Sequence, residues 1–274
     1  MAIKLGIVGG GVMGEALLSR LIAQQLYRPE DVLVSEPQAH QRDVLAQKYG
    51  VQVTSNNRAV AAVSDVLLLA IKPQVFEAVA IELAEDKGER PEGEPLPIVV
   101  SILAGVSLSK LEAAFGCQPV IRAMPNTPAT VGAGITAIAP GKTVSKSQME
   151  QAIAIFQSVG EVVEVSESLM DAVTGLSGSG PAYVAILIEA LADGGVAAGL
   201  PRAIASQLAL STVLGTAQLL QQSELHPAQL KDRVTSPGGT TIAGLAELER
   251  AGFRSALIEA VLAAKERSRQ LGHG

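Results

Sequence analysis

Three glycines near the amino terminus are spaced as a seat for a diphosphate. Gly9, Gly11 and Gly14 fit the pattern G-x-G-x-x-G, which directly follows an apolar run and opens a stretch of helical period at 13–26. The first glycine allows a tight turn, the second lets backbone N–H groups approach a diphosphate, and the third lets the helix pack closely on the sheet. Because the amino terminus of a helix also favours an anion, this spacing predicts a dinucleotide-binding loop.

An acidic residue follows where such loops hold the adenosine ribose. Glu36 ends the second apolar run, VLVSEP, at the usual distance of about 20 residues beyond the glycines. A carboxylate there accepts hydrogen bonds from ribose hydroxyls and repels a 2′-phosphate, which by itself favours NADH. Arg42 lies close enough along the next helix to reach a phosphate, so the preference stays open. Asn57, after the third strand, is expected either to help seat the adenine ribose or to cap the next helix.

Further segments leave the predicted sheet at its carboxyl end, where doubly wound folds bind their ligands. Lys72 and Pro73 follow the fourth strand in LAIKPQ, and Lys72 is interpreted either as a cofactor contact or as a surface lysine. The segment 101–105 leaves the fifth strand with small residues, which favours close approach of backbone to a nicotinamide ring. The segment RAMPNTP at 122–128 contains prolines that stiffen a loop over the same edge. Together these segments predict the wall of a site.

A second glycine-rich loop precedes a helix in the carboxyl-terminal half. The segment TSPGGTT at 235–241 combines consecutive backbone N–H groups at a helix start with several hydroxyl side chains. No lysine lies inside this loop, so it suits a small carboxylate better than a diphosphate. The same residues also make an ordinary helix-entry turn. We interpret the loop as a carboxylate seat because a cofactor loop precedes it in the same chain.

The elements that position these loops fall into two parts. Up to about Val165, short β-branched runs alternate with stretches of helical period, which is typical of a parallel sheet covered on both faces. Two later candidate strands, at 135–139 and 162–165, flank a helix and are expected to extend this sheet. The charged, proline-rich segment 85–97 is expected to be an exposed loop.

Beyond Ser166 the strand pattern ends and helical patterns take over. Helices are expected at 180–198, 201–222, 228–234, 240–249 and 254–271. The sequence therefore predicts an α/β Rossmann-type dinucleotide-binding domain at 1–165 and an all-α dimerisation and substrate-binding domain at 166–274. A helical domain of this size hides a low fraction of its surface, so its apolar stripes are expected to pack against a second copy.

Composition narrows the class of function. Lys and Arg number 21 against 27 Asp and Glu, a net charge of −6, so no basic face for nucleic acid is expected. One cysteine and three dispersed histidines disfavour a disulfide, a histidine triad or a zinc site, and no metal is expected. Lys4 and the glycines interrupt the first apolar run before a signal-peptide core can form, which predicts a cytoplasmic protein. The uncharged stretch 203–223 has the length of a membrane span, but its Ser, Thr and Gln residues favour a buried or interfacial helix and no membrane partner.

Taken together, the motifs resemble one family, the pyrroline-5-carboxylate reductases. The resemblance covers essentially the whole chain and rests on GIVGGGVMG, LAIKPQ, SILAGV, RAMPNTPA, TGLSGSGPAY, EALADGGVAAGLPR and, most specifically, LKDRVTSPGGTTIAGLAELERAGFR. It implies reduction of the cyclic imine L-1-pyrroline-5-carboxylate to L-proline by NADPH or NADH, the last step of proline biosynthesis. It also implies a homodimer with interlocking helical domains, able to assemble into a higher oligomer. The active site would then lie between the cofactor domain of one chain and helices of the dimer.

The resemblance also implies roles for individual residues. It places Val8, Gly9, Gly11, Val12 and Met13 at the cofactor phosphates, Glu36 and Asn57 at the adenosine side, and Ala70, Lys72 and Ala104 toward the nicotinamide. It places Ser236, Gly239, Thr240 and Thr241 around the substrate carboxylate and ring nitrogen, with Glu167 a further substrate contact. Many relatives carry a small hydroxyl residue where this chain has Glu36, so both NADH and NADPH remain open as the cofactor.

The implied chemistry requires neither a histidine nor a metal. A cyclic imine with a protonated nitrogen is already electrophilic, so holding it against the nicotinamide is the main task of the protein. Thr241 is assigned the ring nitrogen as the catalytic residue, and a water or a pre-protonated substrate supplies the proton. A β-hydroxyacid dehydrogenase shares this two-domain plan but relies on a lysine, and none lies between Lys146 and Lys231. A nucleotide-sensing protein without turnover would need the first loop but not the second.

Overall fold

The computed structural model describes residues 3–63, 65–84 and 96–273, and the chain forms two compact units. Unit 1 consists of Met1–Gly178 and Ala263–Gly274, and unit 2 is Ser179–Leu262. This boundary falls later than the end of the strand pattern because Met170 and Val173, beyond the last strand, still pack into the core of unit 1. The division of function between 1–165 and 166–274 stays a prediction. The predicted loop at 85–97 lies outside the described residues, apart from its last two positions.

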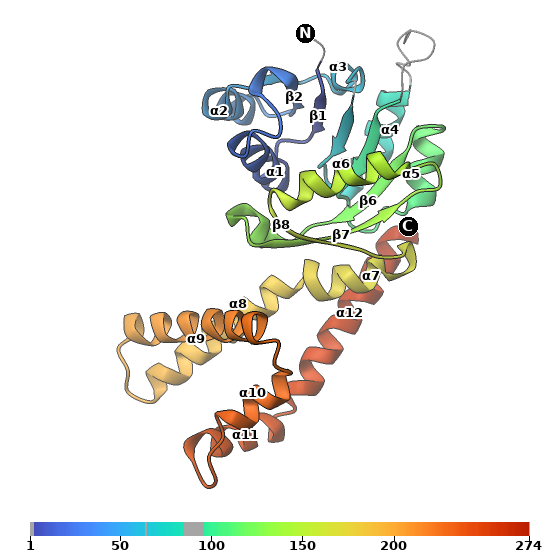
Figure 1. Cartoon of the computed structure of the whole chain (residues 1–274). Helices are drawn as coiled ribbons and strands as arrows, with labels where there is room; N and C mark the ends of the chain where they lie inside the picture. Colours follow the sequence, from blue (N-terminus) through green and yellow to red (C-terminus); the bar gives the residue numbers. More distant parts are fainter. Residues whose placement is uncertain (1–2, 64, 85–95, 274) are drawn as a thin grey trace. The chain divides into compact units, whose positions relative to one another are not determined.

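Within the described residues, unit 1 is built on one eight-stranded sheet (Figure 1). Its strands are β1 (Leu5–Val8), β2 (Val32–Ser35), β3 (Gln52–Thr54), β4 (Val66–Leu69), β5 (Ile98–Ser101), β6 (Val120–Met124), β7 (Gly134–Pro140) and β8 (Gly160–Glu164). They lie in the order β3-β2-β1-β4-β5-β6-β7-β8. The first six strands are parallel, as predicted, and β7 and β8 extend the sheet. However, β7 runs antiparallel to β6, because the link 125–133 is shorter than the dozen or so residues that a parallel crossover takes.

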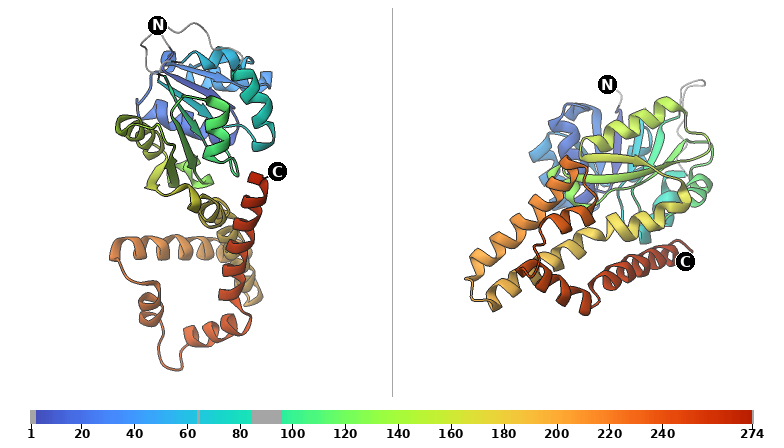
Figure 2. Two further views of the ribbon diagram at one scale, coloured as in Figure 1. Left: turned by 90° about the vertical axis from the view of Figure 1, so that its right-hand side faces the viewer. Right: turned by 60° about the horizontal axis from the view of Figure 1, so that its bottom comes forward.

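Helices cover both faces of the sheet (Figure 2, left), so the strands β1, β2, β4, β5 and β6 are largely buried on two sides, whereas the edge strands β3 and β8 are partly exposed. One face is covered by α1 (Val12–Ala23), α2 (Ala39–Tyr49) and α6 (Lys146–Gln157), and the other by α3 (Asn57–Ala61), α4 (Phe76–Ala84), α5 (Leu108–Phe115) and α7 (Met170–Val173). Short 3-10 helices occur at η1 (Pro29–Asp31), η2 (Pro73–Val75), η3 (Thr127–Val131) and η4 (Glu167–Leu169), and η5 (Thr174–Gly178) is a π-helical turn. Apolar side chains alternate between the two faces: Ile7 packs with α1 and Val8 with α3 and α4. This two-sided burial is the reason that the strands read as nearly continuous apolar runs.

Local signals in the sequence set several helix ends in unit 1. The Ser107 hydroxyl accepts the Lys110 N–H at the start of α5. Ser145 and Gln148 form a reciprocal capping box at the start of α6. Gly50 ends α2 with a φ of +69°, the left-handed conformation that glycine adopts most easily. These caps satisfy N–H and C=O groups that the helices themselves leave free.

Unit 2 is helical, as predicted. Its helices are α8 (Gly180–Ala197), α9 (Arg202–Ser223), α10 (Pro227–Arg233), α11 (Thr240–Arg250) and α12 (Phe253–His273), the last of which continues into unit 1. The helices α8 and α9 lie side by side as a hairpin (Figure 2). Small residues allow this contact, since a Cβ placed on Gly195 would lie 3.0 Å from the Cβ of Ala205.

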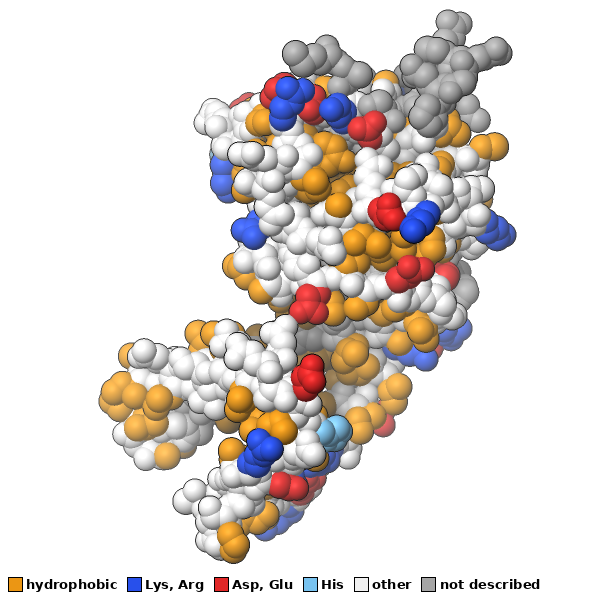
Figure 3. Space-filling model, viewed as in Figure 1, with side chains coloured by type: hydrophobic (Ala, Val, Ile, Leu, Met, Phe, Trp, Pro, Cys, Tyr) orange, Lys and Arg blue, Asp and Glu red, His pale blue; other side chains and the backbone are white. Residues whose placement is uncertain are grey.

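Unit 2 leaves most of its large apolar side chains uncovered. Its buried apolar residues, among those described, are Ala192, Ala205 and Ala209. The exposed surface of the α8–α9 hairpin carries many hydrophobic side chains (Figure 3), including Leu210 and Leu214, which are more than half exposed. Two helical stretches, Glu167–Ala197 and Arg202–Ser223, are long and apolar enough to cross a membrane by length and composition alone. An apolar surface of this extent is typical of an interaction surface.

Candidate active site

The glycine loop has the backbone geometry that its sequence predicts. Gly9 has a φ of +104°, and a Cβ there would lie 2.6 Å from the carbonyl oxygen of Ala70. A Cβ on Gly14 would collide with the carbonyl oxygen of Gly9, whereas a Cβ on Gly11 would meet no atom within 4 Å. Gly9 and Gly14 are therefore required by close packing, and Gly11 leaves open space beside the backbone where a ligand can approach.

The loop presents free N–H groups at the point where the strand order reverses. The sequence of strands changes direction between β1 and β4, which is where doubly wound sheets bind dinucleotides. The helix α1 begins here at Val12, and no side chain caps its first turn. Val12 itself is 73% exposed. The first N–H groups of α1 are thus available to an anion, and they fit a cofactor diphosphate.

Glu36 is buried beside this loop instead of projecting into solvent. Only 7% of the residue is exposed. Its Oε2 accepts the N–H of Gly10 at 3.0 Å, and its Oε1 accepts the N–H of Gln38 at 3.0 Å. The carboxylate that we predict to hold the ribose therefore also fixes the shape of the glycine loop.

Two further side chains beside the glycine loop, those of Gln41 and Glu15, were not identified as site residues from the sequence. The Nε2 of Gln41 donates to the carbonyl oxygen of Gly10 at 2.9 Å and to Glu15 at 3.2 Å. A hydrogen bond from Lys48, opposed by partial burial and aided by Tyr49 and Gln41, lowers the pKa of the Glu15 carboxyl. No sequence motif marks Gln41, because its role depends on α2 packing beside α1.

The guanidinium of Arg42 lies at the carboxyl end of β2. Its Nη1 donates to the carbonyl oxygens of Glu36, at 2.7 Å, and of Pro37, at 2.9 Å. The positive charge therefore lies near the expected adenosine ribose. This position leaves the choice between NADH and NADPH open, since Glu36 and Arg42 favour opposite cofactors.

Asn57 does not cap the next helix, which was one of its two expected roles. Asn56 caps α3 instead, accepting the N–H of Arg58. The Oδ1 of Asn57 accepts the hydroxyl of Ser35 at 2.6 Å, and its Nδ2 donates to Glu82 at 2.8 Å. Asn57, the first residue of α3, thereby links the end of β2 to α4, while its contact with the adenosine side stays a prediction.

The residues predicted to face the nicotinamide follow β4 and β5. Ala70 continues β4 by donating its N–H to the carbonyl oxygen of Val8 at 2.8 Å. Lys72 is exposed, makes no ion pair with a described residue, and precedes Pro73, which opens η2. Ala104 lies three residues beyond β5 and is half-buried. All these residues lie at the carboxyl ends of neighbouring parallel strands, as do the other cofactor residues predicted from the sequence.

The second predicted seat lies in unit 2, at the start of α11. Pro237 and Gly238 occupy the centre of a tight turn closed by the Gly239 N–H donating to the carbonyl oxygen of Ser236 at 3.0 Å. Gly238 has a φ of +67°, which glycine supplies at little cost. Gly239 precedes α11 without a side-chain cap. The first N–H groups of α11 and the hydroxyls of Thr240 and Thr241 are thus free to bind a small carboxylate.

Glu167 lies in unit 1, apart in the sequence from the other predicted substrate residues. Its Oε1 accepts the Leu108 N–H at 3.1 Å and an N–H of Arg122 at 2.7 Å. Its Oε2 is buried without a hydrogen-bond partner among the described residues. Unit 1 therefore brings Glu167 to the start of α5, near Ala104, whereas Ser236, Gly239, Thr240 and Thr241 gather in unit 2.

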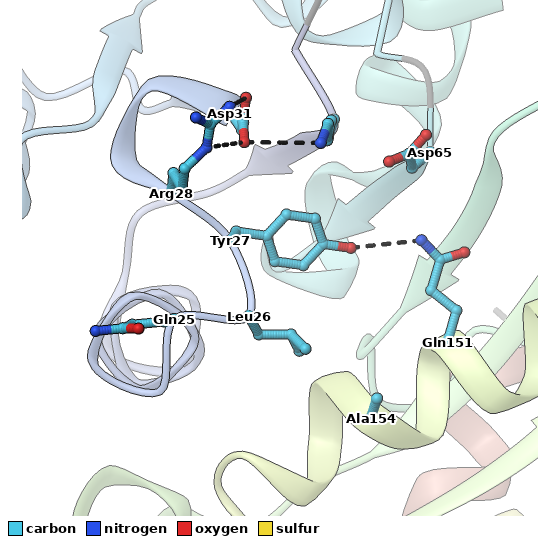
Figure 4. A pocket seen from close by; sticks show the side chains of 9 residues that line it. Gln25, Leu26, Tyr27, Arg28, Asp31, Asp65, Gln151 and Ala154 are labelled. Atoms are coloured by element: carbon cyan, nitrogen blue, oxygen red, sulfur yellow. Dashed lines mark hydrogen bonds and ion pairs between the residues drawn. The ribbon is translucent and has the colours of Figure 1, made fainter.

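The opposite edge of the sheet, where the strands begin, carries a hollow lined by charged side chains (Figure 4). Asp31 pairs there with Arg28 at 3.1 Å and with Lys4 at 3.9 Å. The Tyr27 ring points toward Gln151 (Figure 4), and burial raises the pKa of its phenol to about 12. Arg28, Lys4 and Asp31 are therefore paired with one another, and among the described residues this edge presents no free helix amino terminus like that of α1.

The doubly wound sheet and the free helix terminus at its switch point define a dinucleotide-binding protein of the Rossmann class. Comparison with protein-family models agrees with this class. Residues 4–105 match the family "NADP oxidoreductase coenzyme F420-dependent", and residues 167–271 match "Pyrroline-5-carboxylate reductase dimerisation".

Full-length relatives identify the family. The chain is 62% identical over 272 residues to the pyrroline-5-carboxylate reductase of Synechocystis sp., covering 99% of both chains. It is 42% identical to the Arabidopsis thaliana pyrroline-5-carboxylate reductase over 98% of this chain and 95% of that one. Among solved structures, the Coxiella burnetii pyrroline-5-carboxylate reductase has a TM-score of 0.88 at 36% identity, covering 99% of both chains. The Plasmodium falciparum pyrroline carboxylate reductase, solved with NADP bound, has a TM-score of 0.87 at 32% identity, covering 98% of both chains.

The chain belongs to the pyrroline-5-carboxylate reductase family. This confirms the family resemblance, the fold class and the expectation of a reductase that uses a nicotinamide dinucleotide. Neither the roles of individual residues nor the choice between NADH and NADPH follows from the comparisons, and these stay predictions.

Proposed function

We propose that this chain reduces L-1-pyrroline-5-carboxylate to L-proline with NADPH or NADH. The observation that carries the proposal is the pair of uncapped helix starts, α1 in unit 1 and α11 in unit 2, each preceded by a glycine-rich loop. One suits a diphosphate and the other a small carboxylate. Membership of the reductase family supports the assignment of the two seats to cofactor and substrate.

In unit 1, the cofactor residues fall into three groups along the carboxyl edge of the sheet. We assign the phosphates to Val8, Gly9, Gly11, Val12, Met13 and Gly14, the adenosine side to Glu36 and Asn57, and the nicotinamide side to Ala70, Lys72, Pro73 and Ala104. The steric fit of Gly9 and Gly14 and the open space at Gly11 support the first group. When bound, the reduced nicotinamide supplies the hydride.

In unit 2, we assign the substrate carboxylate to the free N–H groups of α11 and to Ser236, Gly239 and Thr240. Thr241 lies in the first turn of α11, where its hydroxyl can hydrogen-bond the ring nitrogen of a substrate whose carboxylate is held by the same turn. A neutral hydroxyl is a weak acid, so Thr241 orients the nitrogen, and a water or the protonated imine supplies the proton. Glu167, whose side chain is 34% exposed, is kept as a further substrate contact.

We propose that two copies of the chain pair through unit 2, and that dimers can assemble further. The exposed leucines of α8 and α9 and the match to a dimerisation family support this arrangement. Burial against a second copy removes the apolar surface from water, so no membrane partner is proposed. We place the enzyme in the cytoplasm because Lys4 and the glycines interrupt the first apolar run, and the net charge of −6 argues against a nucleic acid as partner. The reaction itself then involves only small molecules.

Thr241→Ala tests the assignment. The variant is expected to lose about tenfold or more in kcat because the ring nitrogen loses its hydrogen bond, while the affinity for the reduced cofactor stays the same. The measurement follows loss of nicotinamide absorbance with pyrroline-5-carboxylate and each reduced cofactor in turn, and cofactor binding is read from its fluorescence. Thr241→Ser keeps the hydroxyl and should retain most of the activity. Unchanged turnover in Thr241→Ala would remove Thr241 from the site, and an inactive natural chain would remove the proposed function.

A further inference from the structure

Arg122 is a buried charge that none of the assigned roles explains. It lies on β6, opposite Ser101 of β5, and only 5% of the residue is exposed. A guanidinium is always charged at physiological pH, and burying it without carboxylate partners costs several kcal/mol. We therefore expect carboxylates to lie beside the guanidinium of Arg122.

Two carboxylates from the segment after β8 face this guanidinium. Its Nη1 lies 2.7 Å from Glu167 Oε1, and its Nη2 lies 3.9 Å from Asp171 Oδ1. The first contact is a short, charge-assisted hydrogen bond. Arg122 thus fixes the chain that runs from η4 into α7 against β6.

Each of these two carboxylates also accepts a hydrogen bond from another helix. Glu167 Oε1 also accepts the N–H of Leu108, the first residue of α5. Asp171 Oδ1 accepts the hydroxyl of Ser268 at 2.7 Å, and Ser268, on α12, is only 3% exposed. One buried arginine is therefore linked to the start of α5 and to the last turns of α12.

Both helices hold the same loop, the segment 102–107 between β5 and α5. Leu108 anchors its far end through Glu167. In its middle, Gly105 has a φ of +77° and lies so close to α12 that a Cβ there would be 3.2 Å from the Cβ of Leu271. In the other direction, a Cβ on Gly272 would lie 2.5 Å from the carbonyl oxygen of Gly105.

A hollow of about 610 Å³ opens between these elements, and Gly105, Arg122, Glu167, Asp171 and Gly272 are among the residues that line it. Ala104, predicted to face the nicotinamide, directly precedes Gly105 in the loop. The position of the Ala104 backbone, predicted to face the nicotinamide, thus depends on the contacts that hold Gly105 and Leu108.

We propose that Arg122 is a positioning residue for hydride transfer. Through Glu167 and Asp171 it holds the loop at Ala104 and Gly105, and so sets the distance between the nicotinamide and the substrate without touching either. The inference rests on the proposed function, and it assigns to Arg122 a role in the geometry of the chemical step, beyond the stability of the fold.

The test compares Arg122→Met with the natural protein and with two further variants. Arg122→Met keeps the length of the side chain and removes its charge. Arg122→Lys keeps a positive charge for Glu167 but cannot reach both carboxylates. Arg28→Met is the matched control, because Arg28 is also ion-paired in unit 1 but lies at the opposite edge of the sheet (Figure 4). Each protein is assayed for kcat, for KM of the cofactor, and for the primary isotope effect when the transferred hydrogen is deuterium.

Displacement of the loop by a fraction of an ångström should lower kcat in Arg122→Met by about tenfold or more. The KM for the cofactor should change by less than about threefold, because the diphosphate seat at α1 is unaffected. The isotope effect should rise as hydride transfer becomes the slow step, Arg122→Lys should recover part of kcat, and Arg28→Met should match the natural protein. A role confined to folding would reduce the amount of active enzyme and leave the isotope effect unchanged.

If Arg122→Met does not fold, Ser268→Ala serves as the second variant, since it cuts only the link from Asp171 to α12. A smaller fall in kcat with a raised isotope effect is then expected. An unchanged isotope effect in every folded variant overturns the inference while the proposed function stands. A natural protein that reduces no pyrroline-5-carboxylate with either cofactor overturns the proposed function itself.

Discussion

The two units of this chain reach stability by different routes. Unit 1 buries large aliphatic and aromatic side chains in two clusters on either side of its sheet, with Leu17 and Phe156 in one cluster and Leu69 and Phe76 in the other. Among the described residues of unit 2, the buried apolar side chains are alanines, while its leucines are exposed or only partly buried. Burial of apolar surface is the main favourable contribution to folding. The comparison shows that unit 1 carries its own core, whereas most large apolar side chains of unit 2 stay uncovered within the chain.

The two predicted ligand seats also differ in how far the surrounding protein fixes them. The seat at α1 is fixed by backbone packing, since Gly9 and Gly14 touch neighbouring backbone and Glu36 holds the Gly10 N–H. The seat at α11 is an exposed turn in which the side chains of Thr240 and Thr241 make no hydrogen bond to any described residue. We therefore expect the cofactor seat to be formed before ligand binding and the substrate seat to be completed by assembly.

The largest effect is expected from Leu210→Glu combined with Leu214→Glu. These leucines lie one turn apart on α9 and are 55% and 56% exposed. Truncating a central interface residue commonly costs about 2 kcal/mol or more, so two buried carboxylates should leave the protein monomeric and nearly inactive. Sedimentation velocity measures the mass, and fluorescence should show that unit 1 still binds the reduced cofactor.

Ile81→Glu is the matched control, because Ile81 is an exposed aliphatic residue on α4 of unit 1. This variant should keep the mass of the natural protein. A double leucine variant of unchanged mass would contradict the proposed interface.

An effect of intermediate size is expected on the free energy of unfolding at alkaline pH, from the buried phenol of Tyr27 in unit 1. The pKa of Tyr27 is about 12 in the folded protein, whereas a tyrosine in an unfolded chain titrates near 10. The contribution of the neutral phenol is thus fully present below pH 10 and is lost as the pH rises through 12, by about 2 kcal/mol at that point.

Urea unfolding of the natural protein and of Tyr27→Phe measures this loss. The two proteins should have similar free energies of unfolding at pH 8, and the natural protein should lose more stability between pH 10 and 12. Parallel pH profiles would show that Tyr27 is accessible to water in solution.

The smallest effect concerns cofactor choice, which we assign to unit 1 alone. Glu36→Ser removes a negative charge from the adenosine side and should raise the ratio of kcat/KM for NADPH over NADH by about tenfold. Steady-state kinetics with both cofactors measures the ratio. Glu30→Ser, which removes an exposed carboxylate at the opposite edge of the sheet, should leave it unchanged. The same ratio in Glu36→Ser would show that another residue, such as Arg42, selects the cofactor.

Much of the fold was predictable because its signals are local. The glycine spacing, the apolar runs of the strands and the periods of the helices agree with the structure, with helix ends in unit 2 placed within about two residues. The errors occur where tertiary contacts decide between local options. Asn56, not Asn57, caps α3, because Asn57 is engaged by Ser35 and Glu82. The reversal of β7 depends on the length of the 125–133 loop, which strand patterns do not report.

The glycine loop of the candidate site was predictable from the motif, while the roles of the site residues stay predictions. Gly9 and Gly14 could be identified because close packing excludes a side chain at each, and Gly11 because the motif expects open space there. Gln41 and Arg122 could not, because nothing in their neighbouring residues marks them. Their roles arise from hydrogen bonds to Gly10 and Glu167, which lie 31 and 45 positions away in the chain.

The sequence by itself determined the division into sheet and helices and predicted the two anion seats, because backbone conformation and apolar periodicity depend on near neighbours. Only the tertiary structure decided that Glu36 holds the glycine loop and that one arginine joins β6, α5 and α12. The physical reason is that a buried charge is stable only where distant segments bring their polar groups to it, and this meeting is a property of the folded chain.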